Sequence, residues 1–183
     1  MDRQMAAQTK RWTLEEVHSL PDDGNKYELV RGELFVTPPP SQEHETILAK
    51  LSRFLEPFVA AQGLGYIYHP RAVVRFEGSE AEPDLMVRRE QTAEERDWDD
   101  APTPILIVEV MSGSTRRRDN VAKRGLYLDA GVPEYWIIDA ERRNVRVVRA
   151  GRADEVVTDA LRWHPPGSAG ALDIELAAIF SKR

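Results

Sequence analysis

The chain has 183 residues, no cysteine and a formal net charge of -6 at pH 7. The absence of cysteine excludes a disulfide framework, a thiolate zinc site and a cysteine nucleophile, and it is typical of the reducing cytoplasm, where we expect this protein. The negative charge argues against a protein that holds nucleic acid through a general basic surface.

The length predicts a single domain over residues 13–183, preceded by a flexible segment over residues 1–12. The segment from Met1 to Arg11 is polar and lacks the apolar core of a signal peptide. No later apolar run approaches the ~20 residues that a membrane helix needs. We therefore expect a soluble protein.

The first predicted elements are a short helix and a β-hairpin. Thr13 and Glu16 have the spacing of a capping box, and the helix that they begin should end by Pro21. Apolar residues then alternate in two strands, which we place at 27–30 and 33–36. Arg31 and Gly32 join them in a tight turn, where glycine permits the unusual backbone angles.

A long helix follows the hairpin. Ser41 is a plausible N-cap, and the helix should run to about Gln62. Pro57 is expected to kink or break it. The apolar residues at helical spacing are Ile47, Leu48, Leu51, Leu55, Phe58 and Val59.

The second half of the chain alternates strands with a helix. An exposed loop is predicted over 89–103 and another loop over 112–115. Gly131 should end the helix over 116–130, so the strands on either side of that helix form a parallel crossover. A closing helix is expected over 174–180. The predicted strands are 66–68, 72–76, 84–87, 105–110, 134–139, 144–149 and 155–158.

Glu109 stands out in the strand over 105–110, which is otherwise apolar on both faces. An ionised carboxylate without a partner there would cost on the order of several kcal/mol, so it needs a cation, a hydrogen-bond donor or a raised pKa. A divalent metal shared with Asp84, which begins an earlier strand, meets this need most simply. The alternative for Asp84 is an ordinary turn residue after Pro83.

An aspartate at a strand end followed by Glu-x-Lys is the pattern of nucleases that hold magnesium with two carboxylates and a backbone carbonyl. The period of two in a strand places Met111 beside Glu109, where this pattern has lysine. The flexible side chain of Lys123, on the next helix, would supply the amine if it projects back over the strand end. An ordinary surface ion pair between Asp119 and Lys123, four residues apart, explains the spacing equally well.

Taken together, these motifs resemble the Uma-type family of restriction-endonuclease-like proteins, within the PD-(D/E)XK nuclease superfamily. The resemblance extends from about Thr13 to Phe180. The matching residues are Tyr27 to Leu34, Pro39 to Ser41, His44, Pro83-Asp84, Val108 to Val110, Ser112, Ser114, Asp119, Lys123, Tyr127 and Gly131 to Trp136.

The resemblance implies an α/β fold of the restriction-endonuclease-like type, with a mixed sheet flanked by helices and an N-terminal β-hairpin. It implies that Asp84, Glu109 and the Val110 carbonyl bind Mg²⁺ or Mn²⁺, and that Lys123 is a displaced catalytic lysine. Glu28 and His44 match family positions that line the site, although a polar strand residue and a capping histidine explain them as well.

We therefore predict a metal-dependent endonuclease that hydrolyses phosphodiester bonds of DNA, with His44 assisting proton transfer. Arg116, Arg117 and Arg118 would hold flanking phosphates, or they are solvated charges on a helix end. A homodimer would bring together the two sites needed to cut both strands. The alternatives are a binding or regulatory module that kept the fold but is slow or silent, and an oligomerising structural protein in which Arg or Lys pairs with Glu109.

Overall fold

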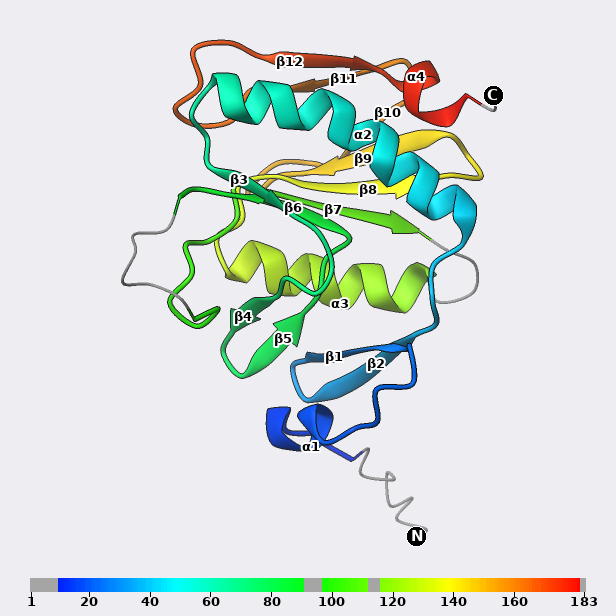
Figure 1. The fold of residues 1–183 in the computed structure, drawn as a ribbon, viewed down its shortest axis with the longest axis vertical. Helices are drawn as coiled ribbons and strands as arrows, with labels where there is room; N and C mark the ends of the chain where they lie inside the picture. The colour runs from blue at the N-terminus through cyan, green and yellow to red at the C-terminus, as the bar shows by residue number, and fades with distance from the viewer. Residues whose placement is uncertain (1–9, 91–96, 112–115, 182–183) are drawn as a thin grey trace, which may run out of the picture.

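The main sheet of the protein has six strands, in the order β10-β9-β8-β7-β6-β3 (Figure 1). The structure is a computed structural model that describes residues 10–90, 97–111 and 116–181, without the side chains of 116–120. Among the described strand pairs of this sheet, β7 and β8 are parallel and the others antiparallel, so the sheet is mixed, as predicted. The strands are β3 (Tyr66–Tyr68), β6 (Leu85–Arg88), β7 (Leu106–Met111), β8 (Tyr135–Asp139), β9 (Asn144–Val148) and β10 (Glu155–Val157).

The helix α3 (Arg116–Asp129) connects the two parallel strands β7 and β8. Its end at Asp129 agrees with the stop predicted at Gly131. Because β7 is apolar on both faces, it needs cover on both sides, and α3 supplies part of that cover through the buried Leu126 and Tyr127. The predicted loop over 112–115 lies outside the described residues, as does most of the predicted flexible N-terminus.

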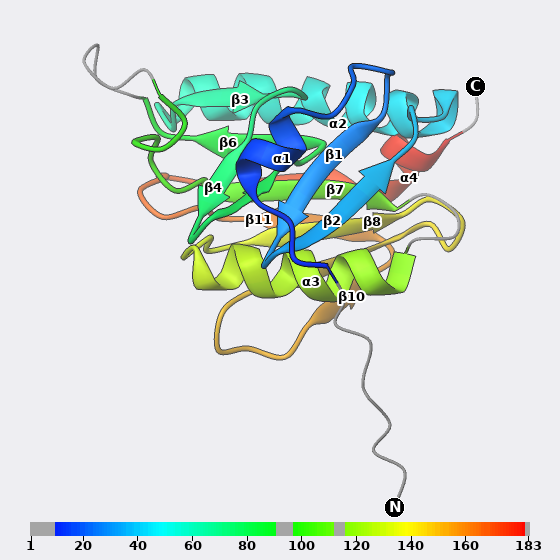
Figure 2. The same ribbon diagram turned by 90° about the horizontal axis from the view of Figure 1, so that it is seen from below.

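A second sheet of four strands lies over the same face of the main sheet as α3 (Figure 2). The predicted hairpin forms one half of it, and Arg31 and Gly32 at its turn have φ values of 52° and 82°. Two positive φ values are typical of the tight turn that matches the twist of a hairpin. The short helix α1 (Leu14–His18) begins with the predicted capping box. The strands are β1 (Lys26–Val30), β2 (Glu33–Thr37), β4 (Val74–Phe76) and β5 (Ser79–Ala81), in the order β2-β1-β5-β4.

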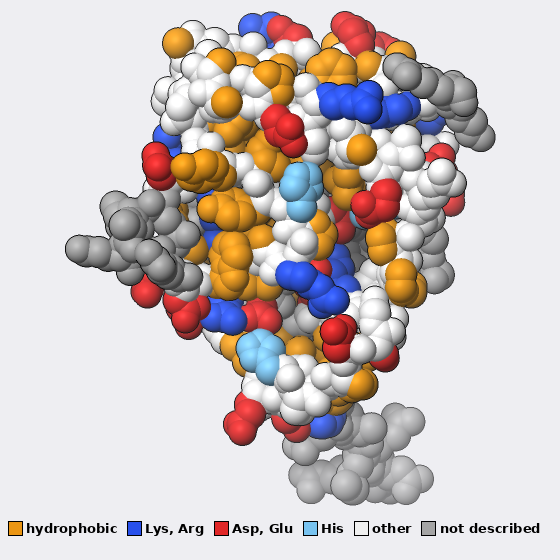
Figure 3. Space-filling view, viewed as in Figure 1, with side chains coloured by type: hydrophobic (Ala, Val, Ile, Leu, Met, Phe, Trp, Pro, Cys, Tyr) orange, Lys and Arg blue, Asp and Glu red, His pale blue; other side chains and the backbone are white. Residues whose placement is uncertain are grey.

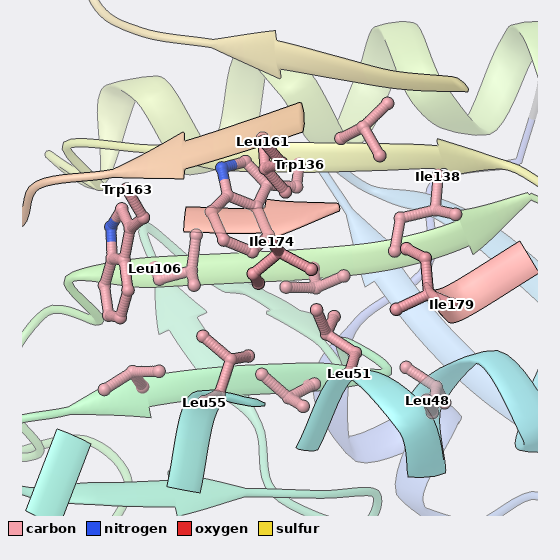
Figure 4. Packing of buried hydrophobic residues seen from close by; sticks show 14 of the residues in the cluster. Leu48, Leu51, Leu55, Leu106, Trp136, Ile138, Leu161, Trp163, Ile174 and Ile179 are labelled. Carbon is pink, nitrogen blue, oxygen red and sulfur yellow. The ribbon is translucent and has the colours of Figure 1, made fainter. Parts of the chain in front are cut away.

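The helix α2 (Gln42–Ala61) covers the opposite face of the main sheet. Its side chains Leu48, Leu51 and Leu55 point at the sheet (Figure 4). The helix continues through Pro57 without a break, although proline costs about 3 kcal/mol inside a helix. Burial of this apolar stripe offsets that cost, because each buried leucine contributes roughly 1.5–3 kcal/mol.

The end of the chain differs from the prediction. The two-stranded sheet of β11 (Ala160–Trp163) and β12 (Leu172–Glu175) packs beside α2, and only then does α4 (Leu176–Phe180) begin. The predicted helix over 174–180 is therefore wrong at its start, because Ile174 pairs with Leu161 and is fully buried in the core. In the described part of the chain, no helix is long and apolar enough to span a membrane.

Gly65 allows β3 to begin directly against β6. Its φ is 106°, and a Cβ atom there would collide with the carbonyl oxygen of Arg88. We expect Gly65→Ala to lower the free energy of unfolding by about 1–3 kcal/mol, measured by urea denaturation. Gly63→Ala is the matched control, since Gly63 has a φ of 60° but nothing within 4 Å of its added Cβ. Equal losses in the two variants would contradict the close approach of the backbones.

Candidate active site

A pocket of about 610 Å³ lies where the hairpin, the start of α2 and the ends of two neighbouring strands of the main sheet meet. The register pairs Leu85 of β6 with Val108 of β7, so Asp84 and Glu109 are the next positions along these strands. The pocket therefore brings together the residues that the sequence singled out on separate elements. Its polar lining includes Lys26, His44, Glu82, Asp84, Glu109 and Lys123.

Asp84 is 6% exposed and has three close partners. Its Oδ2 atom accepts a hydrogen bond from the Val110 backbone N–H at 2.8 Å and lies 3.0 Å from Nε2 of His44. Its Oδ1 atom accepts from the Lys26 ammonium at 3.3 Å. Burial alone would raise the pKa of Asp84, but the hydrogen bond from His44 and the charges of Lys26, His44 and Lys123 lower it below its usual value. Asp84 is therefore ionised at neutral pH.

Glu109 is held from α3, on the far side of the pocket. Both Lys123 Nζ, at 2.9 Å, and the Tyr127 hydroxyl, at 2.7 Å, donate to its Oε1 atom. Burial nevertheless raises the pKa of Glu109 by more than Lys123 lowers it, and the nearby charge of Asp84 raises it further. The cations present therefore compensate this carboxylate only in part.

Lys123 joins Glu109 to the hairpin. It is 6% exposed, and its ammonium also lies 2.8 Å from Oε1 of Glu28. Burial lowers the pKa of Lys123, but Glu109, Glu28 and Asp84 together raise it well above its usual value, so the amine stays charged. The structure thus places the buried Lys123 ammonium beside Glu109, at the end of β7, and not on the surface. The side chain of Asp119, its predicted alternative partner, lies outside the described residues.

Glu28 does not point outward, as a polar residue of a hairpin strand usually does. It is 1% exposed, and its Oε1 atom accepts from the Glu82 backbone N–H at 2.8 Å. Its Oε2 atom is buried and has no hydrogen-bond partner in the described part of the chain. An acceptor left unpaired in this way is costly, so the cluster still has capacity for a cation or a donor.

Two residues that contact the carboxylates of the pocket were not predicted as site residues from the sequence. Lys26 binds Asp84 from β1, and Tyr127 binds Glu109 from α3. A signal for each was available, because Lys26 lies two residues before Glu28 on one strand face, and Tyr127 lies four residues after Lys123 on one helix face. The predicted phosphate contacts Arg116, Arg117 and Arg118 have side chains outside the described residues.

Comparisons with known proteins bear on the fold and the family of the chain. The chain is similar to the crystal structure of a putative nuclease belonging to DUF820 from Anabaena variabilis ATCC 29413, with a TM-score of 0.75, 20% sequence identity, and coverage of 92% of this chain and 97% of that chain. At that identity the likeness shows the fold, which is the predicted one. No curated protein matches. A family model described as "Uma2: Putative restriction endonuclease" matches residues 14–177, so the chain belongs to the Uma2 family.

Proposed function

We propose that the protein is a metal-dependent endonuclease that hydrolyses phosphodiester bonds of DNA. The observation that carries this proposal is the meeting of Asp84, Glu109 and Lys123, from three separate elements, in one pocket. Two carboxylates beside a buried ammonium suit a reaction in which negative charge develops on a phosphate. Membership of a family described as "Putative restriction endonuclease" supports the nuclease reaction itself.

The residues present fit Mg²⁺ or Mn²⁺. Both hydrogen bonds from described residues to Glu109 end on Oε1, which leaves Oε2 for a ligand. No group of three or more His, Cys, Asp or Glu side chains among the described residues is arranged to hold a metal. Magnesium does not require such a cage, because it commonly uses one or two carboxylates and completes its shell with waters and substrate phosphate. Asp84, Glu109 and the Val110 carbonyl would hold it.

The chain's own residues then have distinct tasks in hydrolysis. A bound Mg²⁺ or Mn²⁺ would supply positive charge to the phosphate and favour the hydroxide form of water. Water attacks phosphorus, the bond from phosphorus to the leaving oxygen breaks, and that oxygen gains a proton. Lys123, fixed between Glu28 and Glu109, orients the attacking water or offsets charge on the transition state. His44, on the pocket wall, assists proton transfer.

The surface around the pocket suits local rather than general contact with DNA. Acidic, basic and apolar side chains are interspersed on the face shown in Figure 3. Among the described residues, Arg71 adds a positive charge to the pocket lining. Together with Arg116, Arg117 and Arg118, it would contact phosphates near the scissile bond, and binding should weaken as salt rises.

A structural role for the same residues is the second candidate. The buried ion pair of Glu109 with Lys123 is the arrangement that this alternative requires. It predicts that Glu109→Gln changes stability and that added metal does not. The nuclease proposal predicts instead a saturable metal site that includes both carboxylates.

Calorimetric titration of Mn²⁺ and Mg²⁺ separates these two functions. We expect saturable binding to the wild type, and a loss of at least about tenfold in affinity in both Asp84→Asn and Glu109→Gln, because each change removes a charged ligand. Glu134→Gln is the matched control: Glu134 is a buried glutamate paired with Arg149, outside this pocket. Circular dichroism checks that every variant is folded. Equal affinity in all four proteins, or no binding in any, would contradict the proposed metal site.

A further inference from the structure

The pocket contains a second lysine, which the proposed mechanism does not use. Lys26 on β1 donates to the Glu82 carbonyl at 2.9 Å and to Oδ1 of Asp84 at 3.3 Å. Its side chain is 16% exposed, so it is more accessible than Lys123, which lies deeper between Glu28 and Glu109. The two lysines therefore make their direct ion pairs with different carboxylates.

The backbone of Glu82 holds Lys26 in place beside the strand that begins after Asp84. Its N–H donates to Glu28, and its carbonyl accepts from Lys26. Lys26 and Glu28 lie two residues apart on β1, so they project from the same face of the hairpin. The strand β1 therefore fixes the root of the Lys26 side chain, and the Glu82 carbonyl holds its ammonium at the wall of the pocket.

A divalent cation on Asp84 would compete with this ammonium. The ammonium and a divalent cation beside the same buried carboxylate would repel each other, because charges are poorly screened there. We infer that Lys26 is an exchangeable counter-ion of Asp84: it neutralises the carboxylate before metal binds, and after displacement it contacts the phosphate of the substrate in the pocket. This inference rests on the proposed function and adds a phosphate-binding residue to it.

The accessible position of Lys26 supports this exchange. Lys123 contacts two carboxylates, and a movement away from either would break an ion pair. Lys26 contacts one carboxylate and the Glu82 carbonyl, so it can keep its bond to that carbonyl when it leaves Asp84. The long, flexible lysine side chain allows this short movement without a change in the backbone. If Lys26 only stabilised the fold, there would be no reason for it to be more accessible than Lys123.

Metal affinity and nucleotide affinity should therefore respond to Lys26 in opposite directions. We expect Lys26→Met and Lys26→Gln to bind Mn²⁺ at least about tenfold more tightly than the wild type, measured by calorimetry, because the competing cation is gone. With Mg²⁺ present, the same variants should bind thymidine 5′-monophosphate at least about tenfold more weakly. Lys26→Arg keeps the charge and should resemble the wild type in Mn²⁺ affinity.

Lys50→Met is the matched control, since Lys50 also donates to a backbone carbonyl, that of Ser181, but lies outside the pocket. Suppose that the wild type binds Mn²⁺ tightly and that Asp84→Asn abolishes this binding. If Lys26→Met and Lys26→Gln then bind Mn²⁺ no more tightly than the wild type, the counter-ion role is overturned, but the proposed metal site is not. Unchanged nucleotide binding would overturn the phosphate contact. No Mn²⁺ binding in the wild type or any variant would overturn the proposed function and this inference together.

Discussion

Replacing Lys123 with methionine is expected to lower the free energy of unfolding by about 3–5 kcal/mol at pH 7, without metal. The ammonium lies 2.8 Å from Glu28 and 2.9 Å from Glu109, and all three side chains are buried. Without it, two carboxylates lose their shared cation and cannot be reached freely by water. Urea denaturation followed by circular dichroism measures the loss, with Lys50→Met as the control lysine.

Protonation should rescue this variant in part. The pKa of Glu109 is already raised by burial, and loss of the ammonium would raise it further. A carboxyl group whose pKa is higher in the folded than in the unfolded state favours folding as the pH falls. The destabilisation of Lys123→Met should therefore be smaller at pH 5 than at pH 7, and a second change, Glu109→Gln, should recover part of the loss at pH 7. A loss below about 1 kcal/mol at pH 7 would contradict the buried charge network.

Asp84→Asn should reduce DNA cleavage by at least about 10²–10³-fold, the effect of removing one strong electrostatic contact from an active site. Asparagine has nearly the same shape as aspartate and can still accept the hydrogen bond from the Val110 backbone, so the strand end should keep its structure. It loses the negative charge that would attract the metal. The measurement is the initial rate of cleavage of plasmid and single-stranded DNA in Mn²⁺, after folding is verified.

Glu134→Gln serves as the control for cleavage, because Glu134 pairs with Arg149 at a distance from the pocket lining. It should retain the wild-type rate. If the wild type cleaves DNA and neither Asp84→Asn nor Lys123→Ala reduces the rate, the pocket is not the nuclease site. A wild type that binds metal but cleaves no DNA would favour the binding or regulatory module.

The local sequence pattern singled out one residue of the site, Glu109. Glu109 is conspicuous because its strand neighbours are apolar on both faces, and a buried charge of this kind needs a partner. For Lys123, the spacing alone left a surface pair with Asp119 equally open, and the resemblance to the Uma-type family favoured the site. The spacing of Leu48, Leu51 and Leu55 likewise fixes which face of α2 contacts the sheet.

The remainder depends on tertiary contacts that no local pattern reveals. Lys26 meets Asp84 from 58 positions earlier in the chain, only because the hairpin sheet is laid over the main sheet. The apolar residues around Ile174 in the sequence are compatible with either a strand or a helix. Ile174 lies in a strand because it pairs with Leu161 of β11. At Pro57 the local sequence predicts a kink or a break, but the helix α2 continues. There the packing of the long helix outweighs the low helix propensity of proline.

The alternation of side chains along β1 has a consequence for insertions and deletions in this hairpin. Lys26 and Glu28 share one face, and Tyr27 lies on the other. Loss of a single residue between Lys26 and Glu28 would turn one of them away from Asp84 and Lys123, even if every strand pairing were restored. A substitution at Tyr27 therefore leaves the directions of Lys26 and Glu28 unchanged, whereas a change of length there would turn one of them away from the site.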